Sequence, residues 1–427
     1  MPSHVITMLL VDLVLVLVAA RVLGQLAVRV GQPPVVGEIA AGILAGPTVL
    51  GTHLSTTLFP METRPALTAL ANVGIALFMF VAGMETDLGR FGRNRSAVPV
   101  VALSAYLVPF VLGSAVALTV LARHQTGSRI GFVLYIGCSL AVTAFPVLAR
   151  ILHDRNMFGT PVGQLALGCA AVGDVLAWVV LAAVVATTRT GPGHTWRLLL
   201  LVPLAAGTWW IVRPILGRVL GAATERTVTL VAVCGALLWG AATEWAGLHL
   251  IFGAFLLGVV FPRGSREQVA AAVQPLGALF MPCFFVIAGL RVDLSSTDRA
   301  GVLELLVVVA AAVAGKLGGT YLSARLARIE KHTAQVLAAL LNTRGLTELI
   351  LLDVGLSTGI IGADLYSLLV VMALFTTALT APLLSLLRVG SKHAAGEEHS
   401  RHEDEAIERD DDRVAPGTGR PGEEPTR

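Results

Sequence analysis

Long runs of apolar residues, separated by short polar segments, extend along almost the whole chain. Each run approaches the roughly 20 residues that an α-helix needs to cross the hydrocarbon core of a bilayer. Runs of this length that recur are typical of a protein that crosses the membrane many times. We predict about 13 spans, at residues 5–27, 34–50, 66–84, 97–121, 130–150, 162–186, 197–217, 227–244, 247–262, 270–289, 301–323, 333–356 and 364–387. The predicted fold class is therefore an all-α polytopic membrane protein.

The composition agrees with this pattern and excludes other classes. Of the 427 residues, 55% are hydrophobic and 14% are charged, whereas about 25% are charged in a soluble domain. A soluble enzyme with an apolar core would not need a dozen spans of this length. No nucleotide-binding motif, zinc constellation or nucleophile constellation is present, so we expect no enzyme activity, no cofactor and no nucleic-acid partner. Transport would then be driven by an ion gradient.

The distribution of basic residues predicts the orientation in the plasma membrane. An odd number of spans places the termini on opposite sides. With the N-terminus outside, the inner segments hold about 17 Arg and Lys residues and the outer loops about 7, as the positive-inside rule requires. Residues 391–427 are charged and have too little apolar content to fold alone, so we expect a disordered cytoplasmic tail.

Two motifs occur twice in the chain. Residues 78–88 resemble residues 284–294, and residues 40–47 resemble the stretch from 253 to 262. These matches align the second span with the ninth and the third with the tenth, so the two halves have opposite orientations. Inverted repeats are typical of secondary transporters, with the site between them at the midplane. We expect a transmembrane domain over 1–390, with repeat one at about 5–186, a linker span at 197–217 and repeat two at about 227–387.

A few ionisable residues lie within the predicted spans. Asp174 is the only charge in residues 164–183 and lies near the middle of that span. A carboxylate there costs about 2.5–3.5 kcal/mol on insertion scales, so it indicates an ion or proton site. Lys316 lies deep in the eleventh span, and we expect it to pair with Asp174; a purely structural ion pair is the alternative. Asp12 and Glu304 lie near span ends, where we expect them at the membrane surface.

Two spans contain residues that interrupt helices. Pro146 follows Ser139 and Thr143 in the fifth span, and a proline there should break the helix near Thr143. Gly345 lies among polar residues in the twelfth span. Interrupted helices at matching places indicate a transport site, because freed carbonyls can bind cations. The candidate ion- and proton-binding residues are Asp174, Thr143 and Pro146, Lys316 is the core basic partner, and the broken twelfth span contributes Asn342, Thr343, Arg344, Gly345 and Glu348. The alternatives are an ordinary kink at Pro146 and a local pair between Arg344 and Glu348.

These motifs together resemble the monovalent cation:proton antiporter-2 family. The second span begins with the family-like signature Gly31–Glu38, followed by Ala41–Pro47. Further matches are residues 78–88, 139–150, 170–174, 284–294, Lys316 and 342–349. The resemblance covers about residues 5–390 in order. It is closest to the branch with plant cation/proton exchangers and bacterial potassium-efflux antiporters.

The resemblance implies a 13-helix fold with crossed, broken fifth and twelfth helices, an inverted repeat of two six-helix halves, a homodimer and elevator-like alternating access. Asp174 matches the family's ion- and proton-binding aspartate, and Lys316 matches its core basic residue. The position before the aspartate is usually Asp or Asn, and here it is Gly173. This departure favours electroneutral exchange. Potassium-efflux members often carry a large regulatory domain, so regulation here is either absent or resides on a separate subunit.

The sequence therefore predicts a secondary antiporter that exchanges a monovalent cation for H+. Asp174 would bind either Na+ or K+, or a proton, because one carboxylate cannot hold both. The sequence does not choose between Na+ and K+, since carbonyl and carboxylate oxygens bind either ion. A gated K+ efflux channel, a sodium-coupled symporter of an organic anion and a membrane sensor remain as alternatives.

Overall fold

Helices are the only regular elements in the described part of the computed structural model, which comprises residues 3–85, 97–188, 201–221, 223–246, 250–295 and 297–387. The first half contains α1 (Ser3–Arg29), α2 (Pro34–Ala45), α3 (Pro47–Leu58), α4 (Arg64–Glu85), α5 (Ala97–Leu118), η1 (Ala122–His124), α6 (Arg129–Ala141), α7 (Phe145–Asp154) and α8 (Pro161–Thr188). The second half contains α10 (Leu201–Gly207), η2 (Thr208–Val212), α11 (Arg213–Leu220), α12 (Glu225–Trp245), α13 (Ile251–Val260), η3 (Arg263–Ser265), α14 (Arg266–Leu290), α15 (Arg299–Leu326), α16 (Lys331–Leu341), α17 (Leu346–Ser357) and α18 (Ala363–Leu386). The predicted tail at 391–427 and the first residues of the linker span lie outside the described ranges.

Within the described ranges, nine helices are long and apolar enough to cross a membrane, or ten if the bent pair α2 and α3 forms one span. The chain is thus a multi-pass membrane protein. Fewer spans pass this criterion than the 13 expected, because several apolar segments are short or broken in the structure. For example, α6 has 13 residues and α13 has 10.

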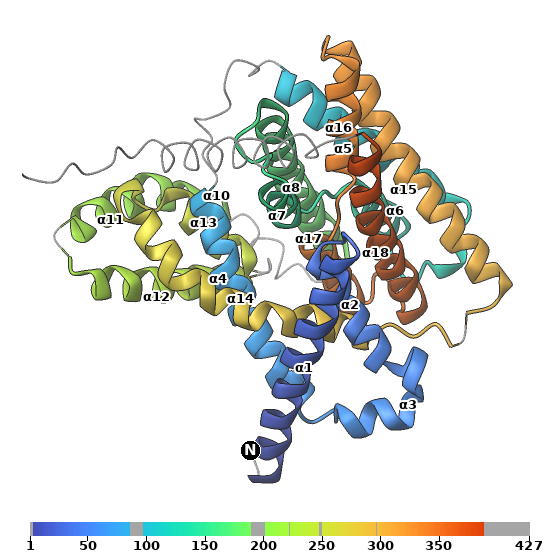
Figure 1. The fold of residues 1–427 in the computed structure, drawn as a ribbon, viewed down its shortest axis with the longest axis horizontal. Helices are drawn as coiled ribbons and strands as arrows, with labels where there is room; N and C mark the ends of the chain where they lie inside the picture. Colours follow the sequence, from blue (N-terminus) through green and yellow to red (C-terminus); the bar gives the residue numbers. More distant parts are fainter. Residues whose placement is uncertain are drawn as a thin grey trace, which may run out of the picture.

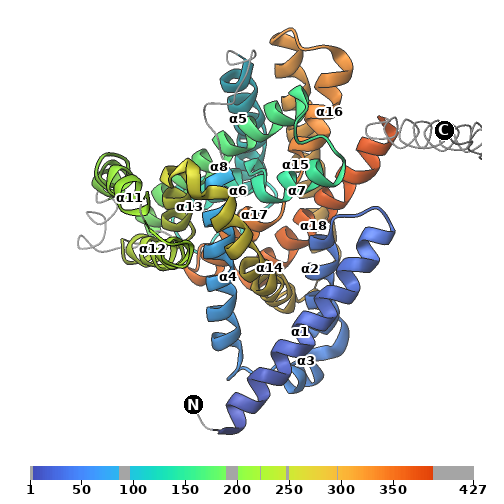
Figure 2. The same cartoon turned by 60° about the vertical axis from the view of Figure 1, so that its left-hand side comes forward.

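The helices pack as two groups, visible from the side-by-side arrangement in Figure 1. The first group contains α1, α2, α4, α12, α13 and α14. The second group contains α5, α6, α7, α8, α15, α16, α17 and α18. Figure 2, a rotated view, shows α12 and α13 still apart from α15 and α16. Helices within each group contact one another far more extensively than helices of different groups.

Glycines let the backbones of the first group touch. A Cβ added to Gly42 of α2 would lie 2.8 Å from the Cα of Gly289 in α14. A Cβ added to Gly83 of α4 would lie 3.1 Å from the Cα of Gly258 in α13. These four glycines belong to the two motifs that occur twice in the sequence. Small residues permit this close approach of helices in a membrane, where packing contacts rather than the hydrophobic effect drive association.

A second pair of contacts repeats at a fixed spacing. A Cβ at Gly37 of α2 would lie 2.7 Å from the backbone nitrogen of Gly24 in α1. A Cβ at Gly253 of α13 would lie 2.6 Å from the backbone nitrogen of Gly240 in α12. Gly37 and Gly253 are 216 residues apart, and so are Gly24 and Gly240. The packing of α1 on α2 therefore recurs in α12 on α13.

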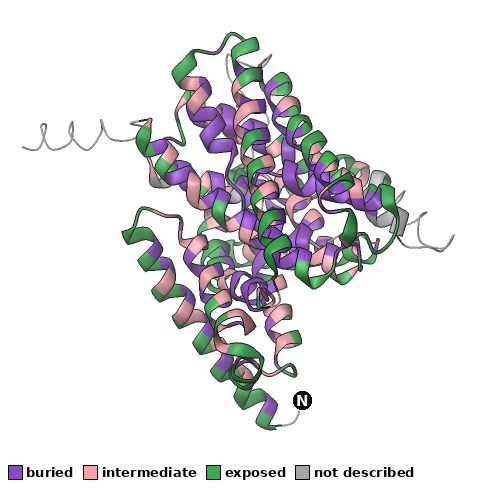
Figure 3. Ribbon diagram, turned by 90° about the vertical axis from the view of Figure 1, so that its right-hand side faces the viewer, coloured by how far each residue is buried: buried purple, intermediate pink, exposed green. Residues whose placement is uncertain are grey.

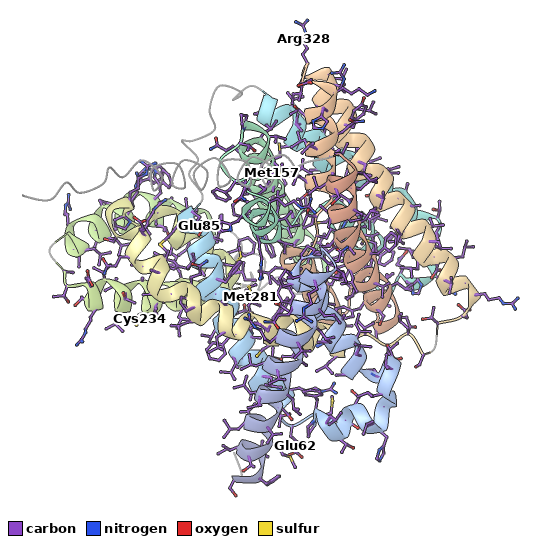
Figure 4. All side chains as sticks on the ribbon, in the orientation of Figure 1. Glu62, Glu85, Met157, Cys234, Met281 and Arg328 are labelled. Carbon is purple, nitrogen blue, oxygen red and sulfur yellow. The ribbon has the colours of Figure 1, made fainter. Side chains whose placement is uncertain are left out.

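Burial is concentrated where the helices meet, whereas outer helix faces are exposed (Figure 3). Many exposed side chains are large and apolar, such as Val14 of α1 and Leu238 of α12, as expected of surfaces that face lipid. Figure 4 shows Glu62 and Arg328 at opposite ends of the molecule.

Two acidic residues expected at the membrane surface are buried instead. Asp12 accepts a hydrogen bond of 2.5 Å from Thr63. Glu304 binds both Arg123, at 2.6 Å, and His124, at 2.9 Å. Each carboxylate is buried because partners distant in sequence satisfy it.

Candidate functional site

The first helix interruption separates α6 from α7. The helix α6 ends at Ala141, and α7 begins at Phe145. Val142 and Ala144 have extended backbone between them. Pro146 occupies the first turn of α7, where its missing N–H leaves no helical hydrogen bond unmade. The interruption lies where the sequence predicts it, at Thr143.

The second interruption separates α16 from α17. The helix α16 ends at Leu341, and α17 begins at Leu346. Gly345 has φ of +153°, a conformation that favours glycine. A Cβ at this position would also lie 2.6 Å from Cγ2 of Val147 in α7. The glycine therefore permits both the turn of the backbone and the contact between the two interrupted spans.

The two interruptions contact each other directly. The backbone N–H of Ala144 donates to the carbonyl of Thr343 at 3.1 Å. The hydroxyl of Thr143 donates to the carbonyl of Leu341 at 3.0 Å. Two helix C-termini, from α6 and α16, and two helix N-termini, from α7 and α17, thus meet inside the second group. Helix C-termini carry partial negative charge and N-termini carry partial positive charge.

Lys316 of α15 binds at the C-terminus of α6. Its ammonium group donates to the carbonyls of Ala105, at 3.1 Å, and Ala141, and to the hydroxyl of Thr143 at 2.7 Å. The side chain is buried. Asp174 interacts with Lys316 electrostatically, but no ion pair within 4.0 Å joins these two described residues. The expected direct pairing is therefore absent, because backbone carbonyls and Thr143 occupy the ammonium group.

Arg344 also binds the C-terminal turn of α6. Its guanidinium donates to the carbonyls of Ser139 and Leu140 at 2.7 and 2.6 Å. It also forms a 3.0 Å ion pair with Glu348, one turn further along. Both side chains are fully buried. A buried ion pair is tolerated only when further hydrogen bonds satisfy its partners, as the two carbonyls do here.

Helix α18 holds the second interruption in place. The Asn342 amide donates to the carbonyl of Thr376 at 3.0 Å. The backbone N–H of Arg344 donates to the hydroxyl of Thr377 at 3.0 Å, and this hydroxyl donates to the Arg344 carbonyl at 2.9 Å. Sequence reasoning missed both threonines. The available signal was two adjacent hydroxyl residues near the middle of a largely apolar span.

Asp174 of α8 faces the two helix N-termini. The backbone N–H of Phe145, at the start of α7, and the hydroxyl of Thr347, in the first turn of α17, interact with its carboxylate. The side chain is 8% exposed, and its Oδ1 is buried without a hydrogen-bond partner. The positive helix ends stabilise a carboxylate here, while the unpartnered oxygen can bind a proton or a cation.

Residues 13–387 match a family described as sodium/hydrogen exchanger, transmembrane. The chain belongs to this family. It is 35% identical to the Na(+)/H(+) antiporter NhaS4 of Synechocystis sp., over 90% of the exchanger chain and 98% of that protein. It is 33% identical to Cation/H(+) antiporter 17 of Arabidopsis thaliana, over 93% of this chain and 52% of that protein. The exchanger chain thus spans nearly all of the bacterial relative and about half of the plant one.

Its fold is similar to that of a solved exchanger. The sodium proton antiporter MjNhaP1 from Methanocaldococcus jannaschii superposes with a TM-score of 0.68 at 14% identity, covering 89% of this chain and 96% of that chain. At this identity the similarity concerns the fold alone.

Gly173, the residue before Asp174, is not crowded by its neighbours in the exchanger. The residue is buried, yet an added Cβ would meet no atom within 4 Å. In the described parts of the exchanger, no three His, Cys, Asp or Glu residues are grouped as a multivalent metal site would require.

The structure brings most of the residues predicted for the ion site together, but several of them make contacts other than those expected. The Thr143 hydroxyl donates a hydrogen bond to the carbonyl of Leu341 and accepts one from the ammonium group of Lys316. Glu348 is engaged by Arg344. Thr347, which is not among the residues predicted for the site, interacts with Asp174 instead.

Proposed function

We propose that this exchanger carries out antiport of a monovalent cation, Na+ or K+, against H+, with Asp174 binding the two in turn. The observation that carries this proposal is the position of Asp174: a buried carboxylate at the N-termini of two half-helices, with one oxygen free of hydrogen bonds. The names of the relatives point to the same class of transport. Neither a channel nor an organic-anion symporter has comparable support.

Competition at one carboxylate couples the two ions. A proton and a dehydrated cation cannot occupy the same oxygens, so binding of one releases the other. Exchange follows if the loaded site crosses the membrane and the empty, charged site does not. Thr347 and freed carbonyls at the interruptions would complete the cation shell. With Gly173 in place of a second acid, one charge is exchanged for one charge, and the cycle is electroneutral.

The finer architecture that we propose has 13 spans, with two six-helix halves as inverted repeats. The recurrence of the α1–α2 glycine contact in α12–α13, at a spacing of 216 residues, supports this symmetry. A second pair of contacts supports the symmetry further. In the repeat, α2 is equivalent to α13 and α14 is equivalent to α4. The α2–α14 contact through Gly42 and Gly289 is matched by the α13–α4 contact through Gly258 and Gly83. Repeat one is about 5–186, the linker span 197–217 and repeat two about 227–387, within a transmembrane domain of 1–390.

The assembly that we propose is a homodimer in the plasma membrane, with the N-terminus outside and the C-terminus cytoplasmic. The basic residues favour this orientation. Residues 391–427 would form a disordered, charged cytoplasmic tail. Any regulatory subunit would be a separate chain.

Asp174→Asn tests the proposal in everted membrane vesicles under a pH gradient. The amide keeps the size of the side chain but can neither take up a proton nor carry the charge that holds a cation. We expect cation-dependent fluorescence dequenching to disappear with both Na+ and K+. Glu225→Gln, the same change at an exposed residue in the first turn of α12, is the control and should retain exchange. Exchange retained by Asp174→Asn would refute the mechanism.

A further inference from the structure

Among the described residues, direct polar contacts between α14 of the first helix group and helices of the second lie at the C-terminal end of α14. Arg291, just after α14, forms an ion pair with Asp353 of α17. The backbone N–H of Asp293 donates to the Ser367 hydroxyl of α18 at 2.9 Å. Close by, the Tyr366 hydroxyl donates to the carbonyl of Ala288 at 3.1 Å. An ion pair and two hydrogen bonds therefore join α17 and α18 of the second group to the C-terminal end of α14 in the first group.

This place lies on one side of the crossing of interrupted helices. The end of α17 and the beginning of α6 share that side, because the Thr126 hydroxyl donates to the Gly359 carbonyl at 2.8 Å. The end of α7 lies on the other side, beside the end of α18, where Arg155 donates to the Ala381 carbonyl at 3.3 Å. We name these the α17 side and the α7 side. In the proposed orientation the α17 side faces outward.

On the α7 side, the facing charges of the two groups are not joined. Glu38 of α2 belongs to the first group and Arg150 of α7 to the second. They interact electrostatically, as do Glu85 of α4 and His153 of α7. Among the described residues, neither combination forms an ion pair within 4.0 Å. Glu38 is 9% exposed, and its Oε2 is buried without a hydrogen-bond partner.

We infer that Arg291–Asp353 and Glu38–Arg150 are two alternating ionic latches, which close the boundary between the helix groups on the α17 side and on the α7 side respectively. This inference rests on the proposed exchange, which requires Asp174 to be reached from one side at a time. These four residues position the helix groups and do not bind the transported ion.

The free oxygen of Glu38 gives the alternation its physical basis. A buried carboxylate oxygen without a partner is unfavourable, and closure on the α7 side would supply the Arg150 guanidinium as a donor. The same movement would separate Arg291 from Asp353, at the end where the groups now touch. Gain of one pair offsets loss of the other, so the two conformations can remain close in free energy, as a bistable element requires.

Cysteine cross-linking tests this inference without depending on transport. The four native cysteines (Cys138, Cys169, Cys234 and Cys283) are first replaced, and exchange is confirmed to remain. One variant then carries Glu38→Cys with Arg150→Cys, and another carries Arg291→Cys with Asp353→Cys. We expect each pair to cross-link in a fraction of the same membrane preparation, detected by gel mobility. Each cross-link should stop exchange, and reduction should restore it.

A control pair lies within one group. Arg155 and Ser385, from α7 and α18, are 3.4 Å apart at their nearest atoms. Arg155→Cys with Ser385→Cys should cross-link without stopping exchange. Failure of the Glu38–Arg150 pair to cross-link, or undiminished exchange in cross-linked protein, would overturn the inference.

Two further measurements separate a latch from a merely structural pair. Glu38→Arg or Arg150→Glu alone should slow exchange by about tenfold, and the two together should recover most of that loss, because the swapped charges restore the pair. The Asp174→Asn background should cross-link like the parent. If Asp174→Asn retained exchange while both cross-links formed and blocked it, the proposed ion site would fail and the latches would stand.

Discussion

At the scale of single residues, the candidate site is defined by the charged side chain that lies at each helix end. Lys316 and Arg344 occupy the negative C-terminus of α6 with hydrogen bonds to its last carbonyls. Asp174 faces the positive starts of α7 and α17. Each charge in the buried crossing is thus opposed by helix ends of opposite sign, which lowers the cost of placing charges there.

Gly345→Ala should destabilise the crossing. A side chain at φ of +153° is strained, and its Cβ would lie 2.6 Å from Val147. We expect a loss of about 1–3 kcal/mol, seen as a lower midpoint of thermal unfolding in detergent, together with slower exchange. Gly318→Ala in α15 is the control, because no atom lies within 4 Å of its added Cβ. Equal stability of the two variants would contradict the role given to Gly345.

Asp293, which follows the C-terminal end of α14, should not contribute to the pH dependence of exchange. The Ser295 hydroxyl and N–H hold the pKa of Asp293 below its usual value of 3.8. Because the pKa of Asp293 is lower in the folded protein than in the unfolded chain, its charge stabilises the fold above the unfolded-state pKa. That stabilisation is lost only when the pH falls through the folded-state pKa. Asp293 therefore stays ionised at any pH at which exchange would be assayed.

The residues that gather at the candidate site can be predicted from the sequence better than the contacts that they make there. Asp174 and Lys316 stand out because charges are rare in apolar spans, and Pro146 and Gly345 stand out because they interrupt helices. The partners of Lys316 are mostly backbone carbonyls, which carry no signature in the sequence. Glu304 is buried because Arg123 and His124 of a distant segment meet it, and such pairing follows only from the tertiary fold.

At the scale of helices, glycines determine which elements cross closely. The repeated motifs predict that residues 40–47 and 253–262 are equivalent. They do not predict that α2 packs on α14 and α4 on α13. Repeated motifs show which segments of the two halves are equivalent, but not which helices contact one another. The interruptions are predicted because Pro and Gly act on the local backbone, whereas helix lengths such as the 10 residues of α13 depend on neighbouring segments.

Gly42→Val and Gly258→Val should both impair folding. Each added side chain would enter the backbone of the helix opposite, at Gly289 for the first and Gly83 for the second. Overpacking of this kind typically costs about 1–3 kcal/mol, and more where backbone must move. Size-exclusion profiles after heating should show less intact protein for both variants. Gly318→Val should match the parent closely, and similar losses in all three would indicate a general effect of valine in a helix.

At the scale of the whole molecule, two helix groups with few contacts between them are suited to relative movement. The second group contains all the residues of the proposed ion site, and close glycine contacts occur within both groups. A site carried entirely by one group can shift against the other without being taken apart. Packing within the first group is tight enough for it to act as a rigid support.

The rate of exchange should not depend on the membrane potential. Moving one net charge across 100 mV changes the free energy by about 2.3 kcal/mol, but one cation exchanged for one proton moves none. We expect equal rates in vesicles clamped at different potentials, with no net current in steady exchange. Gly173→Asp is the comparison because it adds a second carboxylate at a position where an added Cβ meets no atom within 4 Å. A net current from the parent protein would contradict one-for-one exchange.

The three hydrogen bonds of Lys316 have a consequence for the speed of turnover. An ammonium group has three N–H donors, and Ala105, Ala141 and Thr143 accept all of them. The lysine therefore acts on Asp174 only through space. An arriving ion does not have to displace an amine from the carboxylate, and a departing ion leaves no broken bond behind. Loading and unloading can thus proceed while the surrounding scaffold of hydrogen bonds stays intact.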